Sequence, residues 1–163
     1  MNTYTQEINK LYKWANENGL LRSSDESSSG FPKEKSKIFQ MEALNLSDSE
    51  LTEIPKEIGY LTNLKELWLN DNQISTLPDE ITNLVNLEYL YLDHNPLRKL
   101  PTDIDNLINL KVLEVSNTKL KRLPPNIIKL NNMESISFDS TVKDNLFLCQ
   151  TSWIYNIKKT NDD

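Results

Sequence analysis

The chain has 163 residues, of which 37% are hydrophobic, and its 18 basic and 24 acidic residues give a net charge of −6. This composition suits one soluble folded domain and excludes wholesale disorder. The acidic balance argues against non-specific binding of nucleic acid, which usually needs a basic excess, and it favours a partner with a basic or neutral surface.

An amphipathic helix is predicted at the start of the chain. Apolar side chains recur there at helical spacing, at Tyr4, Ile8, Leu11, Tyr12 and Ala15. Thr3 with Gln6 fits a capping box, and Asn18-Gly19 fits a helix stop. We expect this helix to cover one end of the domain, with a partner-binding helix as the alternative. Charged residues are spread through residues 1–19, so neither a secretory signal nor a membrane span is expected.

A connector rich in serine and charge follows at residues 22–37 and contains the sequence SSDESSSG. Such a composition predicts a solvated, mobile linker. Phe31-Pro32 is the apolar pair that would anchor it to the domain. Phosphorylation of the serines is the alternative interpretation.

From residue 41 onward the sequence repeats itself every 23 residues. Four full units and one degenerate unit begin at Met41, Leu64, Leu87, Leu110 and Met133. The fourth and sixth positions of the units are apolar, at Leu44, Leu67, Leu90, Leu113 and Ile136 and at Leu46, Leu69, Leu92, Val115 and Phe138. Each full unit has an Ile-Pro or Leu-Pro pair at its fourteenth and fifteenth positions and closes with Asn63, Asn86, Asn109 or Asn132.

Elementary physics explains this spacing. Alternate residues of a strand share a face, so positions four and six point into a core. One unit cannot bury its aliphatic side chains alone, but stacked units build one continuous core, in which each side chain contributes about 1.5–3 kcal/mol. Proline fixes φ and lacks a donor, which suits a convex crossover. A buried asparagine at the bend after a strand can donate and accept hydrogen bonds between coils.

A second helix is predicted near the C-terminus, before a frayed tail at residues 161–163. Cys149, Trp153 and Ile157 share one helical face, with Leu146 and Ile154 beside it. We interpret this helix as a cap in which Cys149 packs into the core. Because Cys149 is the only cysteine, an intramolecular disulfide and a Cys-rich zinc site are excluded, which favours a reducing compartment.

The repeat resembles the leucine-rich-repeat family, in its 23-residue LxxLxLxxNxLxxLPxxIxxLxN class. It is similar to Ras-group intracellular members and to short bacterial members. The segments LYKWANENGL and FPKEK of this chain also resemble the N-terminal cap of the short bacterial members. The resemblance implies an α/β, right-handed solenoid with a curved five-stranded parallel sheet on its concave side. It also implies a cap helix and connector at 1–40, repeats at 41–141, and a C-terminal cap and tail at 142–163. Family members are usually protein-binding modules.

The ninth position of the repeat departs from the family pattern in three units. Asparagine stands there at Asn72 and Asn95, but the other units have Ser49, Thr118 and Thr141. A hydroxyl satisfies only part of the hydrogen bonding at the bend. We therefore expect looser bends at the two ends of the array.

A binding site is predicted on the concave sheet, where positions three, five, seven and eight point away from the core. Parallel strands lie about 4.8 Å apart, so residues in one column become neighbours. Trp68, Tyr89 and Tyr91 would form an aromatic centre, with Val112 next in its column. Polar residues would surround that centre, at Glu66, Asp71, Asp93, His94 and Glu114. This arrangement predicts binding of a basic or amphipathic protein segment; stacking for stability alone is the alternative.

A basic strip is predicted on one lateral edge of the solenoid. Arg98-Lys99 and Lys121-Arg122 occupy the same slots in consecutive units, and Lys119 lies nearby. The first two units have Thr52-Glu53 and Ser75-Thr76 in those slots. Recognition of an anionic ligand or surface through this strip is the second functional hypothesis, and a solvated edge is its alternative.

Catalytic and metal sites are not expected. His94 near Asp71 and Asp93 could act as a base or a metal ligand, but it is the only histidine and no nucleophile stands beside it. Cys149 would need an activating base. We expect a non-catalytic, cofactor-free, cytoplasmic monomer. Export without a classical signal peptide, as a bacterial effector acting on a host protein, is the alternative.

Overall fold

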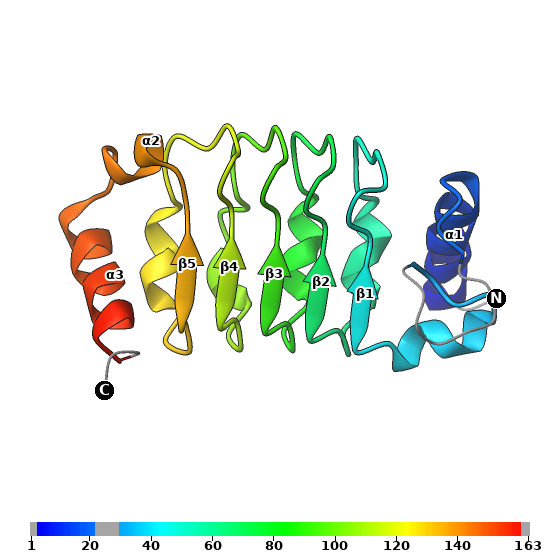
Figure 1. The fold of residues 1–163 in the computed structure, drawn as a ribbon. Coiled ribbons are helices and arrows are strands. Elements are labelled where there is room, and N and C mark those ends of the chain that lie inside the picture. Colours follow the sequence, from blue (N-terminus) through cyan, green and yellow to red (C-terminus); the bar gives the residue numbers. More distant parts are fainter. Residues whose placement is uncertain (1–2, 22–29, 161–163) are drawn as a thin grey trace.

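The computed structural model describes residues 3–21 and 30–160, and its centre is a parallel sheet (Figure 1). Five strands of three residues lie side by side in chain order. They are β1 (Ala43–Asn45), β2 (Glu66–Trp68), β3 (Tyr89–Tyr91), β4 (Val112–Glu114) and β5 (Ser135–Ser137). Leu67 of β2 pairs with Leu44 of β1 and with Leu90 of β3. The 23-residue spacing of the sequence is therefore the register of the sheet.

Short 3-10 helices lie behind the sheet and connect its strands. They are η2 (Lys56–Tyr60), η3 (Asp79–Asn83), η4 (Ile104–Asn106) and η5 (Pro125–Lys129), and η1 (Lys35–Gln40) precedes β1. Pro55, Pro78 and Pro124 stand directly before η2, η3 and η5, with φ of −71°, −67° and −57°. Proline suits these positions because its ring fixes φ near such values and its missing N–H would be unpaired at a helix start.

The core fills the space between the sheet and the 3-10 helices. The fourth and sixth positions of the four full units are fully buried, and so are four isoleucines of the 3-10 helices, Ile58, Ile81, Ile104 and Ile127. In the degenerate unit Ile136 and Phe138 are only partly buried. The core thus weakens where the repeat pattern decays.

Two asparagine ladders tie neighbouring coils together, and the first is the one predicted at the ninth position. Asn72 Nδ2 donates to Leu46 O at 2.8 Å in the preceding coil, and its Oδ1 accepts from Leu51 N at 2.9 Å. Asn95 repeats this arrangement one coil later. A second ladder uses the last residue of each unit. Asn86, Asn109 and Asn132 each donate to a carbonyl of the preceding coil at 2.8 Å, and Asn63 donates to Phe39 O in η1 at 2.6 Å.

The helix α1 (Thr3–Glu17) lies at the β1 end of the solenoid and packs against η2. The predicted stripe is buried at Ile8, Leu11 and Ala15. The chain leaves the helix at Gly19, whose φ is +67°, as the Asn-Gly stop predicts. The side chains of Thr3 and Tyr4 are outside the described part of the structure, so the pairing of Thr3 with Gln6 and the burial of Tyr4 stay predictions.

The predicted connector is wrong in part. Residues 22–29 lie outside the described residues. Residues 33–37 are exposed, as a solvated linker would be, but a helix begins within the predicted connector. Phe31 is fully buried, as the anchoring role requires, and its ring meets Trp14 edge-on at 6.2 Å. The helix η1 begins at Lys35, two residues before the predicted end of the connector, and its Ile38 is buried in the core.

The opposite end carries α2 (Ser140–Lys143) and α3 (Leu148–Thr160), and α3 packs against η5 and β5. The predicted burial of Cys149 is wrong, because its side chain is exposed. The buried face of α3 instead carries Gln150, Ile154 and Ile157. Gln150 sets this orientation, since its Nε2 donates to Leu123 O and Pro124 O at 3.2 and 3.0 Å. Residues 161–163, the predicted tail, lie outside the described residues.

No helix within residues 3–21 and 30–160 is long and apolar enough to cross a membrane. The division of the chain at residues 40 and 141, and the capping role of the end helices, stay predictions.

Candidate protein-binding face

The outer face of the sheet, which we call the sheet face, presents the aromatic residues that the repeat predicts. Leu67 and Leu90 are fully buried, so the residues on either side of each point outward. Trp68 pairs with Tyr91 in the register of the sheet, and their rings stack 5.8 Å apart with an angle of 3° between their planes. Both side chains are half-buried, so a broad aromatic surface faces solvent. The structure thus brings these two residues together as the sequence predicts.

The second aromatic column joins the first. Tyr89 lies on β3 between Glu66 of β2 and Val112 of β4, in register with both. All three side chains are half-buried. Tyr89 and Tyr91 are two residues apart on one strand and therefore share a face. The predicted aromatic centre is one continuous patch on β2, β3 and β4.

Carboxylates flank this patch. Burial raises the pKa of the Tyr91 phenol, and the negative charges of Glu66 and Glu114 raise it further. Both carboxylates therefore lie close enough to Tyr91 to act on its hydroxyl. The phenol stays protonated at neutral pH and offers a hydrogen-bond donor beside two acceptors.

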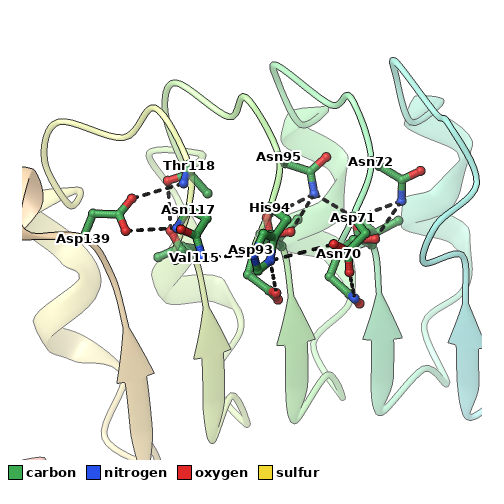
Figure 2. Close-up of polar contacts among 12 residues, drawn as sticks. Asn70, Asp71, Asn72, Asp93, His94, Asn95, Val115, Asn117, Thr118 and Asp139 are labelled. Carbon is green, nitrogen blue, oxygen red and sulfur yellow. Dashed lines mark hydrogen bonds and ion pairs between the residues drawn. The ribbon is translucent and has the colours of Figure 1, made fainter.

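A polar row continues the site above the strands (Figure 2). His94 Nδ1 lies 2.9 Å from Asp93 Oδ2 and 3.9 Å from Asp71 Oδ1. Asn117 Nδ2 lies 3.1 Å from His94 Nε2. An amide nitrogen only donates, so Nε2 of His94 accepts. In the neutral ring Nδ1 therefore carries the proton and donates a hydrogen bond to Asp93 Oδ2. This hydrogen bond is the main reason why the pKa of His94 is raised above 6.5.

The backbone accounts for the residue types in this row. Asp48, Asp71, His94 and Asn117 occupy the eighth position of their units and have φ of 51°, 56°, 54° and 54°. Asp, Asn and His tolerate this left-handed conformation better than most residues. The column of Asp, Asp, His and Asn in the sequence is typical of a left-handed backbone position, which the repeat pattern alone did not predict.

The side chains of Asp71, Asp93 and His94 could together surround a cation. Ligand atoms of Asp71, Asp93 and His94 lie within 4.8 Å of one another. However, Asp71 and His94 are exposed, and the backbone conformation already explains both of them. We therefore assign no metal site to this cluster.

Two family models, described as leucine rich repeat and leucine-rich repeat region, match residues 40–97 and 79–158. Together they span the whole repeat array. The chain is a leucine-rich-repeat protein. No curated protein matches the sequence.

Solved structures of plant receptors are similar to this repeat protein. The plant peptide hormone receptor RGFR1 in complex with RGF2 is 37% identical, with a TM-score of 0.58, over 61% of this chain and 17% of the receptor chain. A TDR receptor is 34% identical over 53% of this chain and 15% of its own, with a TM-score of 0.49, which is too low to support a structural argument. The chain thus spans about a sixth of the length of either receptor chain.

One feature of this leucine-rich-repeat protein escaped the sequence analysis, although its signal was present. The second position of successive units alternates in sign: Glu42, Lys65, Glu88, Lys111 and Glu134. Lys65 pairs with Glu42 at 2.9 Å and Lys111 with Glu88 at 2.5 Å. These contacts raise the pKa of both lysines. The charges therefore form a ladder across neighbouring coils.

The basic strip also gathers as predicted. Arg98, Lys99, Lys119, Lys121 and Arg122 line one open hollow of about 500 Å³. It lies on the loops that join β3 and β4 to η4 and η5, away from the aromatic patch. All five side chains are exposed.

Proposed function

We propose that this protein is a non-catalytic module that binds a basic, amphipathic protein segment on its sheet face. The observation that carries the proposal is the stacked pair of Trp68 and Tyr91. A solvated strand face needs no large aromatic residues for folding, and these two keep part of their surface open. Tryptophan and tyrosine dominate interface hot spots because they bury much area and lose little entropy.

The surrounding charge indicates the chemistry of the ligand. Glu66 and Glu114 flank the aromatic centre, and Asp71 and Asp93 lie at the end of the strands above it. An apolar side chain of the partner would rest on the rings, and lysine or arginine residues beside it would meet the carboxylates. An acidic segment would be repelled.

The similarity to known structures supports a peptide-like ligand. A receptor that is 37% identical over 61% of this chain has been solved as a plant peptide hormone receptor in complex with RGF2. A stack of repeats offers an extended surface on which a peptide segment can lie across several strands.

The proposal can be tested by selection from a display library of random peptides. Peptides selected on the wild type should combine one or two apolar residues with lysine or arginine. The double variant Trp68→Ser/Tyr91→Ser should bind them about 30-fold more weakly, as the loss of about 2 kcal/mol at a hot spot implies. Equal binding by this variant, with its circular dichroism spectrum unchanged, would refute the proposal.

A matched control removes two aromatic residues elsewhere. Phe147 and Tyr155 at the C-terminal end are 50% and 67% exposed. The variant Phe147→Ser/Tyr155→Ser should bind the selected peptides as the wild type does. If it weakens binding as much as the sheet-face variant, non-specific hydrophobic capture explains the result instead.

A further inference from the structure

The basic hollow gathers five cations in one place on the surface. Within residues 3–21 and 30–160, none of the five cations that line it has an ion-pair partner. Of the other ten lysines whose side chains are described, six pair with a carboxylate: Lys10, Lys13, Lys37, Lys65, Lys111 and Lys129. The remaining four, Lys33, Lys35, Lys56 and Lys143, form no ion pair with a described residue but do not line this hollow. Five uncompensated charges thus share one hollow in a chain whose net charge is −6.

Folding does not require cations at these positions. Arg98 and Lys121 stand in one column of neighbouring coils, and Lys99 and Arg122 stand in the next. Like charges that face each other on neighbouring coils repel and destabilise the fold, as they do on neighbouring strands. The first two units accommodate Thr52-Glu53 and Ser75-Thr76 in the same slots.

The second position of the repeat provides an internal comparison. There the chain stacks charged residues across coils as well, but it alternates their sign from Glu42 through Lys65 to Glu88 and beyond. Alternation turns coil-to-coil proximity into attraction. The hollow instead places like charges next to one another. Their repulsion would be relieved by a counter-charge, which the described residues do not supply.

We propose that this hollow binds a compact polyanion that carries two or more phosphate groups. Arginine presents a planar fork that matches two phosphate oxygens, and lysine adds compact positive charge. A volume of about 500 Å³ is in the range of small-ligand sites. Cations from two coils surround the space, so a small molecule with phosphates on several sides can contact all of them.

The charge of the remaining surface favours a compact ligand over an extended one. Without the five cations the chain carries a net −11, that is −6 minus 5. A nucleic-acid duplex would extend past the hollow and be repelled by that surface. An acidic peptide would meet the same repulsion and would offer the arginines fewer oxygens per unit of volume. The phosphates can belong to a soluble molecule or to a lipid headgroup.

Inositol hexakisphosphate is the probe for this site, measured by calorimetry at low and high salt. The wild type should bind it with an affinity that falls steeply with salt. The variant Arg98→Ser/Arg122→Ser should weaken binding by about tenfold for each arginine removed. The control variant Lys13→Ser/Lys56→Ser loses the same charge elsewhere and should bind like the wild type. Absence of binding at low salt, or equal weakening in the control, would overturn the proposal.

Two further ligands sharpen the result. A hexapeptide of aspartate and glutamate should bind at least tenfold more weakly than the probe; equal affinity would overturn the choice of phosphate. Vesicles that contain a phosphoinositide should retain the protein if the ligand is a headgroup, whereas binding of the soluble probe alone indicates a soluble ligand. Retention that survives Arg98→Ser/Arg122→Ser would contradict the site.

This site stands independently of the sheet face. Trp68→Ser/Tyr91→Ser should leave binding of the phosphate probe unchanged, and Arg98→Ser/Arg122→Ser should leave peptide binding unchanged. Either proposal can therefore fail without the other.

Discussion

Replacing Asn95 by alanine should destabilise the solenoid more than any surface change. Asn95 is 2% exposed, and its side chain serves backbone groups of two coils. Its Oδ1 accepts from Ile74 N at 2.9 Å, and its Nδ2 donates to Leu69 O at 2.8 Å and Leu92 O at 3.1 Å. Leu69 O would keep a donor, because Asn72 Nδ2 also lies 3.0 Å from it.

The magnitude follows from the groups left unpaired. Alanine removes the hydrogen bond that Asn95 accepts from Ile74 N and the one that it donates to Leu92 O, and each buried group without a partner costs about 1–3 kcal/mol. The expected loss in the free energy of unfolding is therefore about 2–6 kcal/mol, a large share of the stability of a small domain.

Urea unfolding followed by circular dichroism measures this loss. Asn83→Ala is the matched control, because Asn83 is exposed at the end of η3, and it should change stability by at most about 0.5 kcal/mol. If Asn95→Ala unfolds within about 0.5 kcal/mol of the wild type, the ladder does not hold the coils together and the reasoning fails.

Three further predictions concern other parts of the chain. Gly59→Ala should lower the stability by about 1–3 kcal/mol, since a Cβ there would lie 2.4 Å from the carbonyl oxygen of Glu80; an unchanged melting temperature would contradict this close approach. If α1 caps the core, Leu11→Ala should lower the free energy of unfolding in urea by about 2–5 kcal/mol, because Leu11 is fully buried. A loss of at most about 0.5 kcal/mol, as for a surface substitution, would contradict the capping role. His94 should titrate above 6.5 by NMR, and Asp93→Asn should move its midpoint down. Because the folded pKa is the higher one, the stabilisation from the protonated ring is present below about pH 6.5 and is lost as pH rises through the folded pKa.

The sequence predicted the sheet well because the repeat constrains it many times over. Positions four and six of each unit bury aliphatic side chains, and the 23-residue period fixes which residues lie side by side. The stacking of Trp68 on Tyr91 and the gathering of the basic residues around Arg98 follow from that period alone. Both candidate sites are therefore consequences of one register.

The ends of the chain were harder to predict because no repeat constrains them. The orientation of α3 depends on Gln150, whose amide finds two carbonyls of the neighbouring coil, and a helical periodicity cannot foresee that contact. Apolar periodicity instead favoured Cys149, which is exposed. Likewise Ile38 is buried by its contact with the core, which the polar composition around it concealed.

The three tryptophans allow the most direct test of the central claim, that a partner binds on the sheet face. Trp14 lies in α1, Trp68 on β2 and Trp153 in α3, so their indole NMR signals report on the two ends and the middle of the molecule. On addition of a selected basic peptide, the Trp68 signal should shift while those of Trp14 and Trp153 stay in place. A peptide that binds with the Trp68 signal unchanged, or that shifts an end tryptophan instead, would contradict the account.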